Sequence, residues 1–158
     1  MKNTAVAYFS ATGVTEKIAR RLAGVIGADL IEITPEVPYT KADLNWMDKN
    51  SRSTIEMRDK SSRPALASPG PALDGYDTVF VGFPIWWYVA PTIVNSYLEA
   101  HDLTGKTVIP FATSGGSGMG RTNELLAPSC KGARLLEGRL LNRASEQSIK
   151  AWVETLDI

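Results

Sequence analysis

The residues of this chain best placed to do chemistry form a run of short hydroxyl side chains near its start. Residues 10–15 read Ser-Ala-Thr-Gly-Val-Thr; an apolar run, residues 5–9, precedes them, and a helical pattern, residues 16–23, follows. This order is typical of a strand, a tight loop and a helix. Such a loop directs backbone N–H groups and hydroxyls at one point, at the positive end of a helix dipole. We therefore predict a phosphate site formed by Ser10, Ala11, Thr12, Gly13, Val14 and Thr15.

An ordinary helix cap is the alternative interpretation of the same loop. A cap uses one hydroxyl to accept a hydrogen bond from the first helical amides. This loop offers three hydroxyls, those of Ser10, Thr12 and Thr15, and this surplus favours a bound anion. The loop contains no lysine, so hydroxyls and amides would hold the charge by themselves.

A second candidate segment follows another buried-strand pattern. Pro84 and Ile85 lead into three consecutive aromatic residues, Trp86, Trp87 and Tyr88. Aromatic side chains can stack on a flat ligand. Because side chains alternate along an extended segment, Trp86 and Trp87 cannot both face the core. At least one is expected at a ligand site or at the surface; core packing or a protein interface is the alternative.

The third candidate segment is rich in glycine and follows the strand pattern of residues 106–111. Glycine lets the backbone approach a ligand closely, and the amides of such a loop can bond the polar atoms of a ring. A flexible surface loop is the alternative. A dinucleotide fingerprint is disfavoured, because Arg121 stands where a third glycine is needed. The residues of the segment are Thr113, Ser114, Gly115, Gly116, Ser117 and Gly118.

These three segments, in this order, resemble the flavodoxins. Ser-x-Thr-Gly-x-Thr after the first strand is the flavodoxin pattern that holds the phosphate of FMN. Residues 84–88 and 113–118 are similar to the segments that run beside the flavin and close on its ring. The resemblance covers nearly the whole chain and implies FMN, bound noncovalently by all three segments. It implies neither a catalytic side chain nor a metal, because the flavin carries the chemistry.

The resemblance implies electron transfer through the flavin as the function. An FMN-dependent NAD(P)H:quinone-type oxidoreductase is the alternative, and an interaction module with an empty site is a third possibility. The partner is accordingly either a redox protein or small nicotinamide and quinone molecules. The best-known flavodoxins are strongly acidic, whereas 17 Lys and Arg residues balance 17 Asp and Glu residues here. A neutral surface steers a protein partner weakly, which counts against a simple electron shuttle.

Composition narrows the class of protein further. The chain has 158 residues, which suits one domain over residues 1–158 with a full core. One cysteine and one histidine leave no intrachain disulfide, no cysteine metal site and no basis for a histidine triad. Zero net charge argues against nucleic acid as a partner. No apolar run of membrane length and no targeting segment is visible, so we expect a cytoplasmic protein without a membrane span.

Alternating strand and helix patterns predict an α/β fold: a doubly wound, five-stranded parallel sheet of the flavodoxin order 2-1-3-4-5. In such sheets the ligand lies beyond the carboxyl ends of the strands, where the strand order reverses. That geometry would bring the three candidate segments together. The predicted strands are residues 4–9, 28–34, 77–83, 106–111 and 133–141, and the predicted helices are residues 13–26, 91–100, 120–126 and 145–156.

Residues 36–75 have the least legible pattern. Residues 43–59 could form a helix, and residues 61–75, rich in Ser, Pro, Ala and Gly, are typical of a connecting loop. Glu56 and Arg58 are expected to be solvated charges. The apolar anchors of the possible helix would be Trp46, Met47, Ile55 and Met57.

Overall fold

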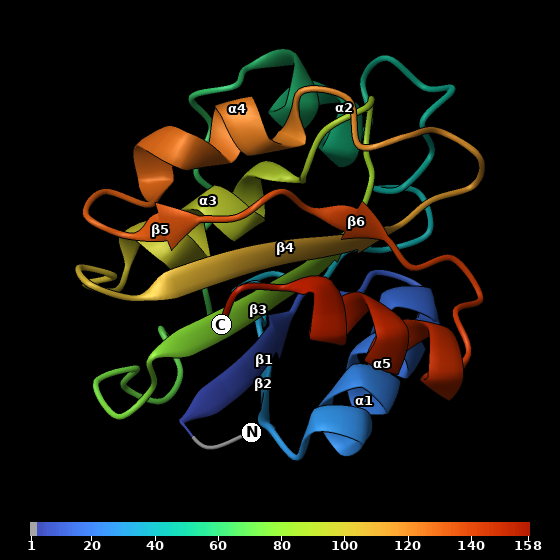
Figure 1. Cartoon of the computed structure of the whole chain (residues 1–158). Coiled ribbons are helices and arrows are strands. Elements are labelled where there is room, and N and C mark those ends of the chain that lie inside the picture. Colours follow the sequence, from blue (N-terminus) through green and yellow to red (C-terminus); the bar gives the residue numbers. More distant parts are fainter. Residues whose placement is uncertain (1–2) are drawn as a thin grey trace.

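A parallel sheet forms the frame of the chain (Figure 1). The computed structural model describes residues 3–158, and its strands lie in the order β2-β1-β3-β4-β5, with β6 also paired to β4. The α/β fold and the strand order 2-1-3-4-5 are confirmed. The strands are β1 (Thr4–Tyr8), β2 (Asp29–Glu32), β3 (Thr78–Pro84), β4 (Thr107–Thr113), β5 (Arg134–Leu135) and β6 (Arg139–Leu140).

Helices cover both faces of the sheet. The helices α1 (Val14–Ile26) and α5 (Glu146–Thr155) pack on one face; α3 (Thr92–Glu99) and α4 (Thr122–Leu126) pack on the other, where α2 (Arg52–Arg58) also lies (Figure 1). A short 3-10 turn, Ala127–Ser129, follows α4. Among residues 3–158, no helix is long and apolar enough to cross a bilayer.

Strand side chains alternate between two buried layers. Val6 and Phe80 face the layer under α1 and α5, where Trp152 packs against Phe80 with ring centroids 5.8 Å apart. Ala7 and Val81 face the opposite layer under α3. The central strands are apolar at almost every position, so both faces of the sheet must be buried.

The range predicted to contain the fifth strand, residues 133–141, holds two short strands, because Pro110 interrupts the partner strand β4. Pro110 lies in β4 and has no N–H to donate to the ladder. The side chain of Asn123 fills the gap: its amide nitrogen donates to Leu136 O at 2.7 Å, and its oxygen accepts from Gly138 N at 3.3 Å. The strand therefore divides into β5 and β6 on either side of this bridge.

The predicted helix over residues 43–59 is also wrong over most of its length, since only Arg52–Arg58 is helical. Of the four proposed anchors, only Met57 is buried; Trp46, Met47 and Ile55 are exposed. The side chains of Asn45 and Asp48 accept hydrogen bonds from backbone amides two residues further on. Such local turns compete with helical hydrogen bonds and keep residues 45–50 irregular.

Candidate functional site

The loops after β1, β3 and β4 meet at one edge of the sheet. Phe9 N donates to Gly82 O at 2.9 Å, and Ile85 N donates to Thr113 O at 2.8 Å, so each strand passes into its loop beside its neighbour. The structure thus places the three predicted segments at the carboxyl ends of three adjacent parallel strands, where the strand order reverses.

Residues 10–15 form a tight loop whose amides are largely open. Ser10 Oγ accepts hydrogen bonds from Gly13 N and Glu16 N, both at 3.1 Å, and its own O–H proton stays available. Gly13 adopts φ 93°, a left-handed conformation that glycine favours, and α1 starts directly after it. Within residues 3–158, no acceptor is found for the N–H groups of Ala11, Thr12, Val14 and Thr15.

The third predicted hydroxyl of this loop has a different environment. Thr15 is buried, and its Oγ1 lies 2.8 Å from Thr113 Oγ1 at the end of β4. This contact ties the first loop to the third. Thr12, by contrast, is exposed. The loop therefore combines one capping hydroxyl, one bridging hydroxyl and one hydroxyl open to solvent.

The aromatic segment makes a strained turn. Trp86 N donates to Val89 O at 2.9 Å and Val89 N donates to Trp86 O at 3.2 Å, which closes a two-residue hairpin. The central residues Trp87 and Tyr88 have φ of 49° and 68°. Positive φ at both central residues is the pattern of a type I′ turn, which usually has the sequence Asn-Gly. A residue other than glycine in this left-handed conformation destabilises the fold by about 1–3 kcal/mol. Their side chains are presented outward, with Tyr88 66% exposed.

Trp86 faces inward and belongs to an aromatic cluster. Its ring lies edge-on to Phe9 and Tyr39, with centroids 5.7 Å and 5.4 Å away, and Phe9 and Tyr39 are 5.5 Å apart. Edge-to-face packing of this kind fixes ring orientation. The structure thus separates the aromatic run: Trp86 packs against the core, while Trp87 and Tyr88 lie at the surface.

A cavity of about 620 Å³ opens between the second and third loops. Its volume is in the range of small-molecule sites, and its walls are mostly aromatic side chains and glycine backbone. Residues 10–15 lie outside its lining, as do Pro84, Thr113, Ser114 and Gly118. The lining consists of Leu44, Trp46, Ser53, Ile85, Trp86, Trp87, Tyr88, Gly115, Gly116 and Ser117.

The glycine-rich loop is held in place by Asn142, a residue that the sequence did not indicate. Asn142, which follows β6, accepts from Ser114 N at 2.7 Å and donates to Ser114 Oγ at 3.2 Å. Ser114 Oγ in turn donates to Ser117 O at 2.6 Å. The loop is therefore braced across the sheet edge, and the amides of Gly115 and Ser117 make no hydrogen bond within the described residues.

A polar cluster of Tyr39, Arg52 and Glu56 lies beside the aromatic cluster that contains Trp86. Tyr39 donates its phenolic proton to Glu56 Oε1 at 2.5 Å, and Arg52 Nε lies 2.9 Å from Glu56 Oε2. The Arg52 guanidinium also lies 3.8 Å from the centroid of the Tyr39 ring. Burial, reinforced by the hydrogen bond to Glu56, raises the pKa of Tyr39 well above its usual range. The expectation that Glu56 is a solvated charge is wrong, because its side chain is only 15% exposed.

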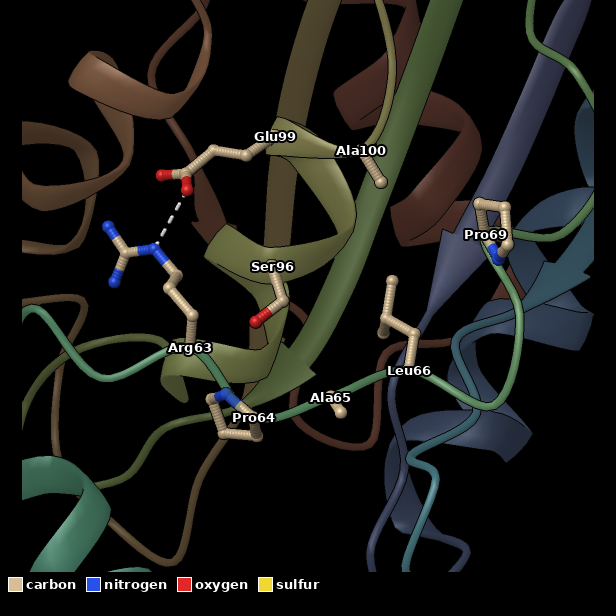
Figure 2. Close-up of a pocket in the computed structure, with 8 residues that line it drawn as sticks. All are labelled: Arg63, Pro64, Ala65, Leu66, Pro69, Ser96, Glu99 and Ala100. Carbon is tan, nitrogen blue, oxygen red and sulfur yellow. Dashed lines mark hydrogen bonds and ion pairs between the residues drawn. The ribbon is translucent and has the colours of Figure 1, made fainter.

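A second hollow lies away from the three loops, between residues 63–69 and α3 (Figure 2). Figure 2 shows its rim, where Arg63 Nε and Glu99 Oε1 form an ion pair at 2.9 Å. The rest of its lining is small or apolar, apart from the hydroxyl of Ser96. This hollow presents no convergent set of open polar groups, so we do not assign a ligand to it.

The arrangement at the sheet edge suits a ligand with an anionic end and a flat end. The open amides of Ala11, Thr12, Val14 and Thr15 can bind an anion, and the cavity beside Trp86 can receive a planar ring. The hydrogen bond between Thr15 and Thr113 joins the first loop to the third.

Comparisons with known proteins find relatives that share the sequence pattern and the fold of the chain. A family model described as flavodoxin matches residues 3–156. A provisionally named flavoprotein from Bacteroides uniformis ATCC 8492 shares 48% identity over 98% of this chain and 99% of its own, with a TM-score of 0.93. A second such protein, from Bacteroides eggerthii DSM 20697, shares 47% identity over 100% and 99% of the two chains, with a TM-score of 0.95.

A more distant structure shares the fold alone. It is a flavoprotein in complex with FMN from Lactobacillus acidophilus NCFM, with 18% identity over 97% of this chain and 99% of its own, and a TM-score of 0.70. No curated protein sequence matches the chain significantly.

Proposed function

We propose a function from one premise: the chain belongs to the flavodoxin family. The proposal is that it binds FMN noncovalently at the loops after β1, β3 and β4 and acts in electron transfer. When bound, FMN supplies the chemistry by taking up and releasing one or two electrons. The observation that carries the proposal is the set of open amides at Ala11, Thr12, Val14 and Thr15, at the same sheet edge as an aromatic cavity.

The first loop would hold the phosphate of FMN. The N–H groups of Ala11, Thr12, Val14 and Thr15 have no acceptor within residues 3–158, and they lie at the start of the 13-residue helix α1. A phosphate group accepts such hydrogen bonds strongly, and the helix dipole favours its negative charge. The exposed hydroxyl of Thr12 and the O–H of Ser10 would complete the set.

The cavity would hold the flavin ring. Trp86 is fixed by Phe9 and Tyr39 and forms one wall, while the backbone at Gly115 and Gly116 forms another. Glycine allows close approach of the backbone, and the open amides of Gly115 and Ser117 can donate to the oxygens of the ring. Packing of these walls on the ring would exclude water from most of its surface.

A specific observation favours the oxidoreductase alternative as a second candidate. Trp46 and Tyr88 line the cavity and are 69% and 66% exposed, so apolar rings surround its mouth. Such a mouth can receive a nicotinamide or quinone ring by stacking. The balanced surface charge gives little electrostatic steering toward a protein partner.

A flavin titration tests the proposal. We expect FMN to bind with quenched fluorescence, and riboflavin, which lacks the phosphate, to bind at least about 100-fold more weakly, because it forfeits two or more charge-assisted hydrogen bonds. Failure to bind FMN would refute the proposal, and equal affinity for riboflavin would refute the role of residues 10–15.

Anaerobic addition of NADH and NADPH to the FMN complex separates the two candidates. Rapid bleaching of the bound flavin by a nicotinamide supports the oxidoreductase. A complex that is bleached by dithionite but not by either nicotinamide supports an electron carrier that a separate reductase serves.

A further inference from the structure

Ser53 has a buried hydroxyl that nothing in the described chain satisfies. The residue lies in the first turn of α2 and is 2% exposed. Within residues 3–158, its Oγ is one of two buried side-chain oxygens without a hydrogen-bond partner. A buried polar group without a partner is uncommon and costly. Ser53 also lines the cavity beside Trp86, so a residue with an unsatisfied hydroxyl lies at the wall of the proposed ring site.

The position of Ser53 is fixed from both sides. Ser51 caps α2 by accepting from Thr54 N, and Ser53 N donates to Asp43 O at 3.0 Å. Arg52 and Glu56 then lock the helix to Tyr39. Because both ends of the turn are held, the backbone of Ser53 is fixed beside the cavity.

We propose that Ser53 hydrogen-bonds a polar atom of the bound flavin ring, so that α2 supplies a fourth contact element beside the three loops. The inference rests on the proposed function, since it takes FMN as the ligand. The flavin ring carries carbonyl oxygens and ring nitrogens along one edge, and a serine hydroxyl can donate to or accept from them. The apo chain bears the cost of an unsatisfied hydroxyl, and the ligand relieves it.

This assignment predicts opposite effects on the apo protein and on binding. In Ser53→Ala, the unsatisfied hydroxyl is gone, so the thermal midpoint of the apo protein should stay the same or rise. The dissociation constant for FMN should increase about 3- to 10-fold, the equivalent of one lost hydrogen bond. Ser53→Cys nearly keeps the side-chain volume without a strong hydroxyl and should weaken FMN binding similarly, which separates hydrogen bonding from packing.

Two control variants distinguish a hydrogen bond from Ser53 to the flavin from a general loss of stability. Ser129 is buried and its hydroxyl donates to Glu99 at 2.7 Å, far from the cavity lining. Ser129→Ala should lower the apo midpoint and leave FMN affinity unchanged. Ser51→Ala removes the cap of α2 and should lower the apo midpoint, so it shows what a loosened helix does.

The outcomes distinguish this inference from the proposed function. A wild-type chain that binds no FMN overturns both. A wild-type chain that binds FMN, with Ser53→Ala matching it within twofold, overturns the role of Ser53 alone. A Ser53→Ala variant whose apo midpoint falls as far as that of Ser51→Ala also overturns it, because the hydroxyl would then be structural.

Discussion

Replacing Tyr39 by Phe tests whether the polar cluster of Tyr39, Arg52 and Glu56 stabilises the fold around Trp86. The change removes only the phenolic oxygen, which donates to Glu56 at 2.5 Å, and keeps the ring that packs on Phe9 and Trp86. Hydrogen bonds to charged groups contribute about 1.5–3 kcal/mol. Glu56 is 15% exposed and retains Arg52 at 2.9 Å, so we expect the lower half of that range, about 1.5–2 kcal/mol.

The assay is urea and thermal unfolding of the apo protein followed by circular dichroism. For a chain of this size, about 1.5–2 kcal/mol corresponds to a fall in Tm of about 3–8 °C. Tyr76→Phe is the matched control: its hydroxyl donates to Asp29 at 2.5 Å in an exposed setting, where we expect a change within about 0.5 kcal/mol.

A double-mutant cycle completes the design. Glu56→Ala should cost at least about 1 kcal/mol less in the Tyr39→Phe background than in the wild type, because the hydrogen bond between the two side chains is already absent. The reasoning is refuted if Tyr39→Phe changes stability by less than about 0.5 kcal/mol, or if the two substitutions add independently.

Four further perturbations probe the rest of the chain. Gly82→Ala should destabilise the protein by about 3 kcal/mol in urea unfolding, since the new Cβ would lie 2.2 Å from the Phe111 ring; a neutral result would contradict the packing. Asn123→Ala should cost about 2–3 kcal/mol in the same assay, because two backbone groups of the divided strand lose their partner; an effect near zero would argue against the bridge. Tyr88→Gly should raise the apo Tm, by relief of about 1 kcal/mol at φ 68°, and a lower Tm would show that the turn is not strained. Burial raises the pKa of the Cys130 thiol to about 11 from 9.0, so the contribution of the neutral thiol to stability is intact below pH 9 and is lost toward pH 11. The difference in unfolding free energy between the wild type and Cys130→Ala should therefore fall by up to about 1.4 kcal/mol per pH unit in that window, and parallel pH curves would contradict this assignment.

The elements that depend on local pattern were predictable from the sequence. The positions of α1 and α5 follow from apolar period and end signals: Gly27 caps the end of α1 and Ser145 caps the start of α5. The strand order follows from the resemblance to the flavodoxins. The convergence of the three candidate loops follows from the topology of a parallel sheet. These features need no knowledge of distant side chains.

The residues that brace the site were not predictable, because their roles depend on contacts remote in sequence. Asn142 and Asn123 look like ordinary polar loop and helix residues until the sheet edge brings each to the backbone that it bonds. Tyr39, Glu56 and Ser53 lie within residues 36–75, where the sequence has no clear apolar period, so no periodicity marked them. The inward orientation of Trp86 also depends on Tyr39, and alternation alone could not choose it.

The hydrogen bond between Thr15 and Thr113 joins residues 98 positions apart, and this has a consequence for biosynthesis. The loop of residues 10–15 is translated well before its partner on β4, and Asn142, which braces the third loop, follows later still. Contacts between such distant segments form slowly, because chain closure must precede them. The edge that joins the three loops is therefore expected to be complete only after β4 and Asn142 have been translated, so a nascent chain that stops before them should not capture the ligand.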